Sequence, residues 1–199
     1  MKGTAAAAPS PTRRALKAFL RSPSFADCQV ASATAALQAH ITAGHIVILI
    51  SASPLHVTRL IGEHFGAHVA CGSVCPEREG IYVRAQHGNT CLVGENKQKA
   101  LDHLVSRYNI DLSASFAYGD HPTDIDVLSR VGNPRVVNPT TAMERIADKR
   151  GWKVLPGSEQ VNRGATGLLT AISSIVKAAQ TDLEEHKGPE LVPAPASKL

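Results

Sequence analysis

The sequence predicts one α/β domain built on a doubly wound, parallel β-sheet. Three observations predict it: 199 residues suit one domain with tails, the composition is globular with 43% hydrophobic and 19% charged residues, and apolar β-branched runs alternate with longer amphipathic stretches. No run reaches the roughly 18 to 20 apolar residues that a membrane span needs. Aromatic residues, at 4%, are too scarce for a surface that stacks nucleic-acid bases. We therefore expect no membrane span and no nucleic-acid partner.

The expected strands and helices alternate along the chain. Residues 45–50, HIVILI, form the continuous apolar run of a strand that is buried on both faces, and residues 54–65 have helical spacing. A short strand at 67–71 precedes a hairpin at 73–83. The later expected elements are helices at 97–108, 122–130, 141–149 and 164–180 and strands at 115–118, 135–137 and 153–155.

Two tails flank the expected core domain of residues 27–180. Residues 1–26 carry five basic and no acidic side chains, which resembles a transit peptide; the alternative is a helical segment, RRALKAFL, left from a cap region. Residues 181–199 are polar and proline-spaced, so we expect a flexible tail.

The tail ends in Ser197, Lys198 and Leu199, which match the peroxisomal address. We expect a peroxisome, or the related glycosome, as the location and the peroxisomal import receptor as a partner. The alternatives are the cytoplasm or, through residues 1–26, the mitochondrion. The four cysteines lack CxxC spacing and a secreted disulfide pattern, which favours a reducing compartment.

Polar residues follow the expected strands, at the edge where open α/β sheets bind ligands. After HIVILI come Ser51, Ala52, Ser53 and Pro54, where a hydroxyl and the backbone N–H groups of a helix start can hold a phosphate oxygen. The alternative is structural, because Ser53 before Pro54 is also a typical helix N-cap.

Two carboxylates stand four residues apart after the expected strand SFAY. Asp120 ends the strand and Asp124 lies in the first helical turn, so both can face one hard cation such as Mg²⁺. Alternatively, Asp120 caps the helix and Asp124 complements its dipole. Lys97 stands at a helix start, where the dipole disfavours a cation, and an anion within its reach would explain it.

Four stretches together resemble the haloacid dehalogenase (HAD) superfamily, most closely its phosphoserine-phosphatase-like subfamily IB. They cover about residues 36–155 in the family's order and read AHITAGHIVILISASP, GENKQKALDHL, DLSASFAYGDHPTDIDVLSRVGNPRVVNP and ADKRGWKVL. The resemblance implies a Rossmann-like three-layer fold and Mg²⁺-dependent hydrolysis of a small phosphorylated substrate. It also implies that Ser51 and Ala52 bind the phosphoryl group, that Lys97 neutralises it, and that Asp120 and Asp124 hold the metal.

One motif of that family is missing. Such enzymes attack phosphorus with the first aspartate of a DxDx(T/V) motif on the first, central strand, but Asp27 is the only carboxylate before Ser51. Without that nucleophile, we expect no turnover of phosphate esters. We also expect the first central strand and most of the cap to be missing, which leaves a gap or a foreign segment between the strands at 45–50 and 115–118.

Two interpretations follow. In the first, which stability favours, the sequence is an incomplete chain of an active phosphatase. In the second, it is a pseudo-enzyme that binds a phosphorylated ligand or a protein partner without hydrolysis. A plain nucleotide-binding domain is disfavoured because no GxGxxG or GxxxxGK(S/T) motif follows a strand.

Overall fold

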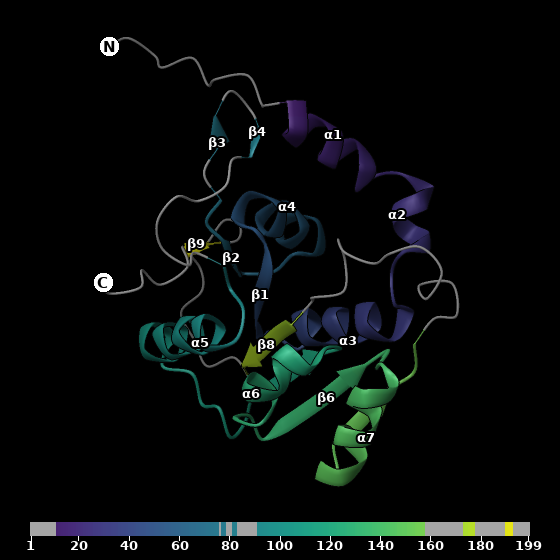
Figure 1. Ribbon diagram of the computed structural model, residues 1–199, viewed down its shortest axis with the longest axis vertical. Helices are drawn as coiled ribbons and strands as arrows, with labels where there is room; N and C mark the ends of the chain where they lie inside the picture. The colour runs from purple at the N-terminus through teal and green to yellow at the C-terminus, as the bar shows by residue number, and fades with distance from the viewer. Residues whose placement is uncertain are drawn as a thin grey trace.

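The computed structural model describes residues 11–75, 77–78, 81–82, 91–157, 173–177 and 190–192, which form helices and strands in alternation (Figure 1). The helices are α1 (Pro11–Phe19), α2 (Pro23–Asp27), α3 (Ala31–Thr42), α4 (Leu55–Phe65), α5 (Glu95–Tyr108), the 3₁₀ turn η1 (Pro122–Asp124), α6 (Ile125–Leu128) and α7 (Thr141–Arg150). The strands are β1 (Ile46–Pro54), β2 (Val69–Ser73), β3 (Glu77–Arg78), β4 (Ile81–Tyr82), β5 (Phe116–Gly119), β6 (Asn133–Val137), β7 (Lys153–Leu155), β8 (Ser173–Lys177) and β9 (Glu190–Val192). No helix within these ranges is both long enough and apolar enough to cross a bilayer.

Seven strands form one sheet in the order β7-β6-β5-β8-β1-β2-β9. Neighbouring strands run parallel except at β8, which is antiparallel to both β1 and β5. Since β8 opposes both of its neighbours, β1 and β5 run in the same direction and their carboxyl ends lie at the same edge. The expected α/β sheet is therefore confirmed, with one antiparallel strand at its centre.

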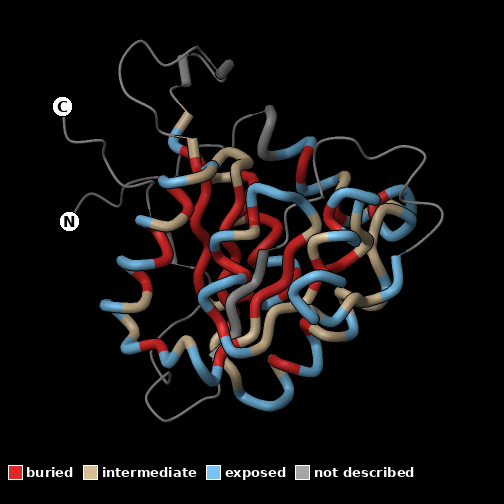
Figure 2. Tube along the Cα trace, turned by 60° about the horizontal axis from the view of Figure 1, so that its bottom comes forward, coloured by how far each residue is buried: buried red, intermediate tan, exposed pale blue. Residues whose placement is uncertain are grey.

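Helices cover both faces of the sheet, which gives three layers (Figures 1 and 2). Along β1 the side chains alternate between the two hydrophobic clusters: Ile48 and Ile50 join one, and Val47 and Leu49 join the other. The first cluster includes residues of α5, α6 and α7, and the second includes residues of α1 to α4. This double burial explains the uninterrupted apolar run, because neither face of β1 meets solvent.

Strand β8 fills the place where the sequence predicted a gap or a foreign segment. The expected helix over 164–180 is wrong at residues 173–177, which pair with β1 and β5 instead. The physical reason is the two apolar neighbours: an unpaired inner edge on β1 or β5 would leave buried N–H and C=O groups without partners. The β-branched Ile175 and Val176 also suit a strand.

The N-terminal helices belong to the same core as the sheet. Leu16, Leu20 and Phe25 are buried in the cluster that contains α4, and the ring centroid of Phe25 lies 5.9 Å from that of Phe65. The RRALKAFL stretch is therefore largely helical and packs on this chain. The expected domain boundary between residues 26 and 27 falls inside α2.

The two remaining strand pairs lie away from the sheet centre. β3 and β4 pair antiparallel, as the expected hairpin over 73–83 requires. β9 lies inside the stretch expected as a flexible tail, and there the structure differs: residues 190–192 pair with β2 at the edge of the sheet. The Ser197, Lys198 and Leu199 address lies outside the described residues.

A row of hydrogen-bonded side chains connects the two halves of the sheet, which lie on either side of β8. His40 at the end of α3 contacts Tyr118 of β5 through Nε2 at 2.7 Å and His45, just before β1, through Nδ1 at 2.8 Å. Burial, followed by the nearby His45 and Arg135, lowers the pKa of His40. A neutral His40 therefore links α3, β1 and β5.

Candidate active site at the carboxyl edge of the sheet

The sheet register places Ser51 and Asp120 at the same level. Ile48 of β1 and Ala117 of β5 both pair with Ile175 of β8. Ser51 lies three residues after Ile48 in β1, and Asp120 lies three residues after Ala117, directly past the end of the parallel strand β5. They are thus separated by two strand spacings, about 10 Å at 4.8 Å each, on either side of the position that β8 occupies.

Ser51 lies in the last part of β1, four residues before α4 begins at Leu55. It is buried, and its hydroxyl oxygen accepts a hydrogen bond from the backbone N–H of Ser53 at 3.1 Å. Pro54, not Ser53, occupies the N-cap of α4, and no side chain in the described part of the protein caps that helix. The structural alternative for this loop, a serine cap, is therefore wrong, and the uncapped helix start suits an anion.

Lys97 is buried in the first turn of α5, with 3% of its surface exposed. Its Nζ lies 2.5 Å from Oδ1 of Asp124, in a buried ion pair. The anion that the sequence predicted within reach of this lysine is thus present as a side chain of this protein. Lys99, two residues on, is exposed and pairs with Glu95.

Asp124 keeps one oxygen without a partner. The residue is 2% exposed, and Oδ2 is buried with no hydrogen-bond partner among the described residues. Gly119 makes room for it, because a Cβ on Gly119 would lie only 2.7 Å from the Cβ of Asp124. His121, not Asp120, caps η1, so the alternative in which Asp120 caps the helix is wrong; Asp124 lies in the first turn, where the dipole alternative places it.

The pKa of Asp120 depends on both charges of the Lys97–Asp124 pair. Burial and then the carboxylate of Asp124 raise the pKa of Asp120 from 3.8 to about 7, against the opposing effects of a backbone hydrogen bond and of Lys97. The three side chains therefore form one electrostatic unit. Gly119 and the Lys97–Asp124 contact escaped the sequence analysis; the only signal for Gly119 is a glycine directly before the carboxylate.

The two carboxylates fit a Mg²⁺ ion. Within the described ranges no group of three or more His, Cys, Asp or Glu side chains could hold a metal. Mg²⁺, however, is commonly held by only one or two carboxylates, completed by water and substrate phosphate. The unpartnered Oδ2 of Asp124 and the raised pKa of Asp120 are both relieved by a cation between them.

We expect Asp120→Asn to stabilise the metal-free protein at pH 8. Since the folded pKa of about 7 exceeds the ordinary 3.8, the stabilising contribution of Asp120 is complete below about pH 4 and is lost as the pH rises through 7. Removal of the charge should raise the free energy of unfolding by about 1 to 2 kcal/mol at pH 8 and by much less at pH 4. Urea titrations at the two pH values measure this.

The exposed Asp126 provides the matched control. Asp126→Asn should change the free energy of unfolding by less than about 0.5 kcal/mol at either pH. Equal effects of the two substitutions would show that Asp120 is not electrostatically strained.

Comparisons with known proteins identify the family of the chain. The fold and the site define an α/β protein with a lysine, two aspartates and a serine loop at the carboxyl edge of its sheet. The haloacid dehalogenase-like hydrolase family matches residues 2–129, and the chain belongs to this family. The expected superfamily is thereby confirmed, as is its Rossmann-like fold.

The chain is similar in sequence to several bacterial proteins. The chain is 34% identical over 124 residues to "Inhibition of morphological differentiation protein" of Streptomyces azureus, covering 62% of this chain and 44% of that protein. It is 32% identical to "Phosphoserine phosphatase SerB1" of Mycobacterium tuberculosis, covering 59% and 38%. It is also 32% identical to "Probable phosphatase Rv3661" of the same species, covering 66% and 45%. The chain thus spans less than half the length of these relatives.

One solved structure is similar. It is a crystal structure of a protein with unknown function from Bordetella pertussis Tohama I, at a TM-score of 0.61 and 25% identity. The match covers 74% of this chain and 68% of that one.

Proposed function

We propose that the chain binds phosphomonoesters together with Mg²⁺, as the phosphate-binding part of a HAD-type phosphatase. The observation that carries the proposal is the buried Lys97–Asp124 pair with its unpartnered Oδ2 beside Asp120. A purely structural ion pair would have its second oxygen hydrogen-bonded, because a buried acceptor without a partner costs about 1 to 3 kcal/mol. Family membership and relatives with phosphatase names support the same chemistry.

The charges explain why a cation is needed. With both aspartates ionised, Lys97, Asp120 and Asp124 carry one net negative charge, which would repel a phosphate dianion. Mg²⁺, held by Asp120 and Asp124, would neutralise the phosphate oxygens and polarise the phosphorus centre. Lys97 has three N–H donors, of which one serves Asp124, so another can donate to a phosphate oxygen.

The phosphate also needs donors from the opposite side of the crevice. Ser51 provides a hydroxyl there, and the uncapped start of α4 provides backbone N–H groups. Ser51 and Ala52 therefore orient the phosphoryl group, while Lys97 and the cation hold its charge. These groups bind the phosphate but do not attack it. The five residues of β8, between β1 and β5, are Ser-Ser-Ile-Val-Lys and contain no carboxylate that could act as the nucleophile.

We expect the 199-residue chain to bind inorganic phosphate in the presence of Mg²⁺ and to leave p-nitrophenyl phosphate intact. Titration calorimetry should detect phosphate binding that depends on Mg²⁺, and Ser51→Ala should weaken it roughly tenfold. Asp120→Asn should remove the Mg²⁺ dependence, whereas Asp126→Asn should preserve it. Absence of phosphate binding would refute the proposal, and turnover that Asp120→Asn abolishes would show that another group acts as the nucleophile.

The relatives with phosphatase names favour a second function, in which the same site hydrolyses phosphomonoesters. That function requires a carboxylate on a segment that replaces β8 beside Ser51 and Asp120. Phosphatase activity from a longer version of the chain, lost on substitution of such a carboxylate, is the test.

The Ser197-Lys198-Leu199 end supports a peroxisomal or glycosomal location and recognition by the import receptor. A fluorescent protein fused ahead of residues 181–199 should enter these organelles and stay in the cytosol when Leu199 is deleted. Mitochondrial import through residues 1–26 would favour the rival signal.

A further inference from the structure

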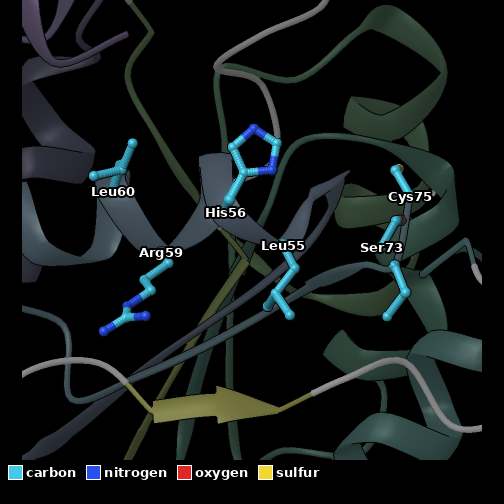
Figure 3. A pocket seen from close by; sticks show the side chains of 7 residues that line it. Leu55, His56, Arg59, Leu60, Ser73 and Cys75 are labelled. Atoms are coloured by element: carbon cyan, nitrogen blue, oxygen red, sulfur yellow. The ribbon is translucent and has the colours of Figure 1, made fainter. Parts of the chain in front are cut away.

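A pocket of about 290 Å³ opens beside the proposed phosphate loop, between the start of α4 and the end of β2 (Figure 3). Leu55, His56, Arg59 and Leu60 line it from α4, and Ser73, Val74 and Cys75 line it from the end of β2. At about 30 Å³ for each water of the liquid, this space holds about ten water molecules. It therefore suits a small organic group.

The pocket and the phosphate loop are physically joined. The Ser73 hydroxyl donates to the backbone oxygen of Ala52 at 2.6 Å and accepts a hydrogen bond from the Leu92 N–H at 2.9 Å. Gly72 lies against the start of α4 so closely that a Cβ would meet the Leu55 Cα at 2.5 Å. A phosphate held at Ser51 therefore has this pocket next to it, four residues along the chain at Leu55.

The lining combines an apolar wall with positive charge. Leu55, Leu60 and Val74 supply the apolar surface, and Val74 is 38% exposed. Arg59 supplies a permanent cation, and none of the seven lining residues is acidic. Figure 3 shows Arg59 and Leu60 on one side, Ser73 and Cys75 on the other, and Leu55 and His56 between them.

Glu63 is the acidic group that competes for Arg59. It lies one turn further along α4, and its Oε1 is 3.0 Å from Arg59 Nε. That approach does not have hydrogen-bond geometry, since Nε is buried without a hydrogen-bond partner in the described part of the chain. Two partly exposed groups paired at i and i+4 are held together weakly. A ligand carboxylate can therefore engage the planar guanidinium.

We infer that this pocket holds the organic group of the phosphorylated ligand, and that this group is an apolar stretch ending in a second anion, which Arg59 binds. The inference rests on the proposed function, because the phosphate anchors the ligand at Ser51. It names a substrate class: phosphomonoesters of apolar hydroxy acids. O-phosphoserine also carries a carboxylate, but it lacks the apolar stretch, and its ammonium group meets the Arg59 cation and no acidic lining residue.

Four probes and the full 199-residue chain test this by calorimetry with Mg²⁺: inorganic phosphate, phenyl phosphate, 4-carboxyphenyl phosphate and O-phosphoserine. We expect 4-carboxyphenyl phosphate to bind about five- to tenfold more tightly than phenyl phosphate, because a charge-assisted hydrogen bond is added. O-phosphoserine should bind less tightly than 4-carboxyphenyl phosphate, because it lacks the apolar stretch and Arg59 repels its ammonium group.

Substitutions test whether the pocket at Arg59 causes the preference for 4-carboxyphenyl phosphate. Arg59→Gln should remove the preference for the carboxylated probe and leave inorganic phosphate binding unchanged, and Val74→Asp should weaken that probe by repulsion. Arg130→Gln is the matched control, since Arg130 also pairs with a carboxylate, that of Asp102 at 2.6 Å, but does not line the pocket.

The outcomes separate the two proposals. If inorganic phosphate binds but Arg59→Gln leaves the preference intact, or if O-phosphoserine binds as tightly as 4-carboxyphenyl phosphate, the inference about this pocket is overturned while the phosphate site stands. If inorganic phosphate itself fails to bind, the proposed function and the inference both fall.

Discussion

Lys97→Met should lower the free energy of unfolding by about 3 to 5 kcal/mol at neutral pH, because it leaves the Asp124 carboxylate buried without its counter-charge. Lys97 and Asp124 are 3% and 2% exposed, so water does not replace the lost partner. Asp124 then also faces Asp120, whose pKa it already raises. Equilibrium unfolding in urea, followed by circular dichroism, measures the loss.

Two further variants distinguish a buried charge from lost packing. Lys99→Met is the matched control, since Lys99 is about half exposed and pairs with Glu95 one turn earlier; it should cost less than about 0.5 kcal/mol. The double variant Lys97→Met, Asp124→Leu should regain most of the stability, because replacement of both charges by apolar groups is often nearly neutral. Similar losses for Lys97→Met and Lys99→Met would contradict the buried pair.

Ile175→Pro should destabilise the protein by about 3 kcal/mol or more, since proline cannot donate to a central ladder. Ile175 pairs with Ile48 on one side and Ala117 on the other, so it joins the two halves of the sheet. A kink there disturbs both neighbours. The free energy of unfolding, again from urea titration, is the measurement.

Leu191→Pro provides the comparison at the sheet edge. Leu191 lies in β9, which has β2 as its one neighbour among the described strands, and proline is tolerated better in edge strands. Its effect should be clearly smaller than that of Ile175→Pro. If Ile175→Pro were no more damaging than Leu191→Pro, residues 173–177 would not form the centre of the sheet.

The parts of the fold that the sequence predicted are those with a strong local pattern. HIVILI is the continuous apolar run that a doubly buried strand shows, and the helical spacing before Phe65 predicted the start of α4 to within one residue. Residues 164–180 were predicted as a helix, because Leu168, Ile172, Ile175 and Val176 fit a helical period. Only the unpaired edges of β1 and β5, which are a tertiary property, decide that 173–177 is a strand.

The candidate site, like the fold, could be predicted from the sequence only in part. The rule that ligands lie beyond the carboxyl ends of parallel strands placed Ser51 and Asp120 at one edge, and the sheet register agrees. Direct contact between Lys97 and Asp124 could not be predicted, since it depends on how α5 and η1 pack across 27 residues of sequence. The pocket at Arg59 also depends on the packing of α4 against β2 and has no motif of its own.

The central position of β8 also determines when the sheet can close during synthesis. Ile48 and Ile175 pair across 127 residues of sequence (175 − 48), so β1 leaves the ribosome long before its inner partner exists. At 5 to 20 residues per second this interval lasts about 6 to 25 s. During it β1 and β5 each expose an apolar strand edge, the surface on which chains aggregate and which chaperones bind. The nascent chain therefore depends on protection of these edges until residues 173–177 emerge and pair with them.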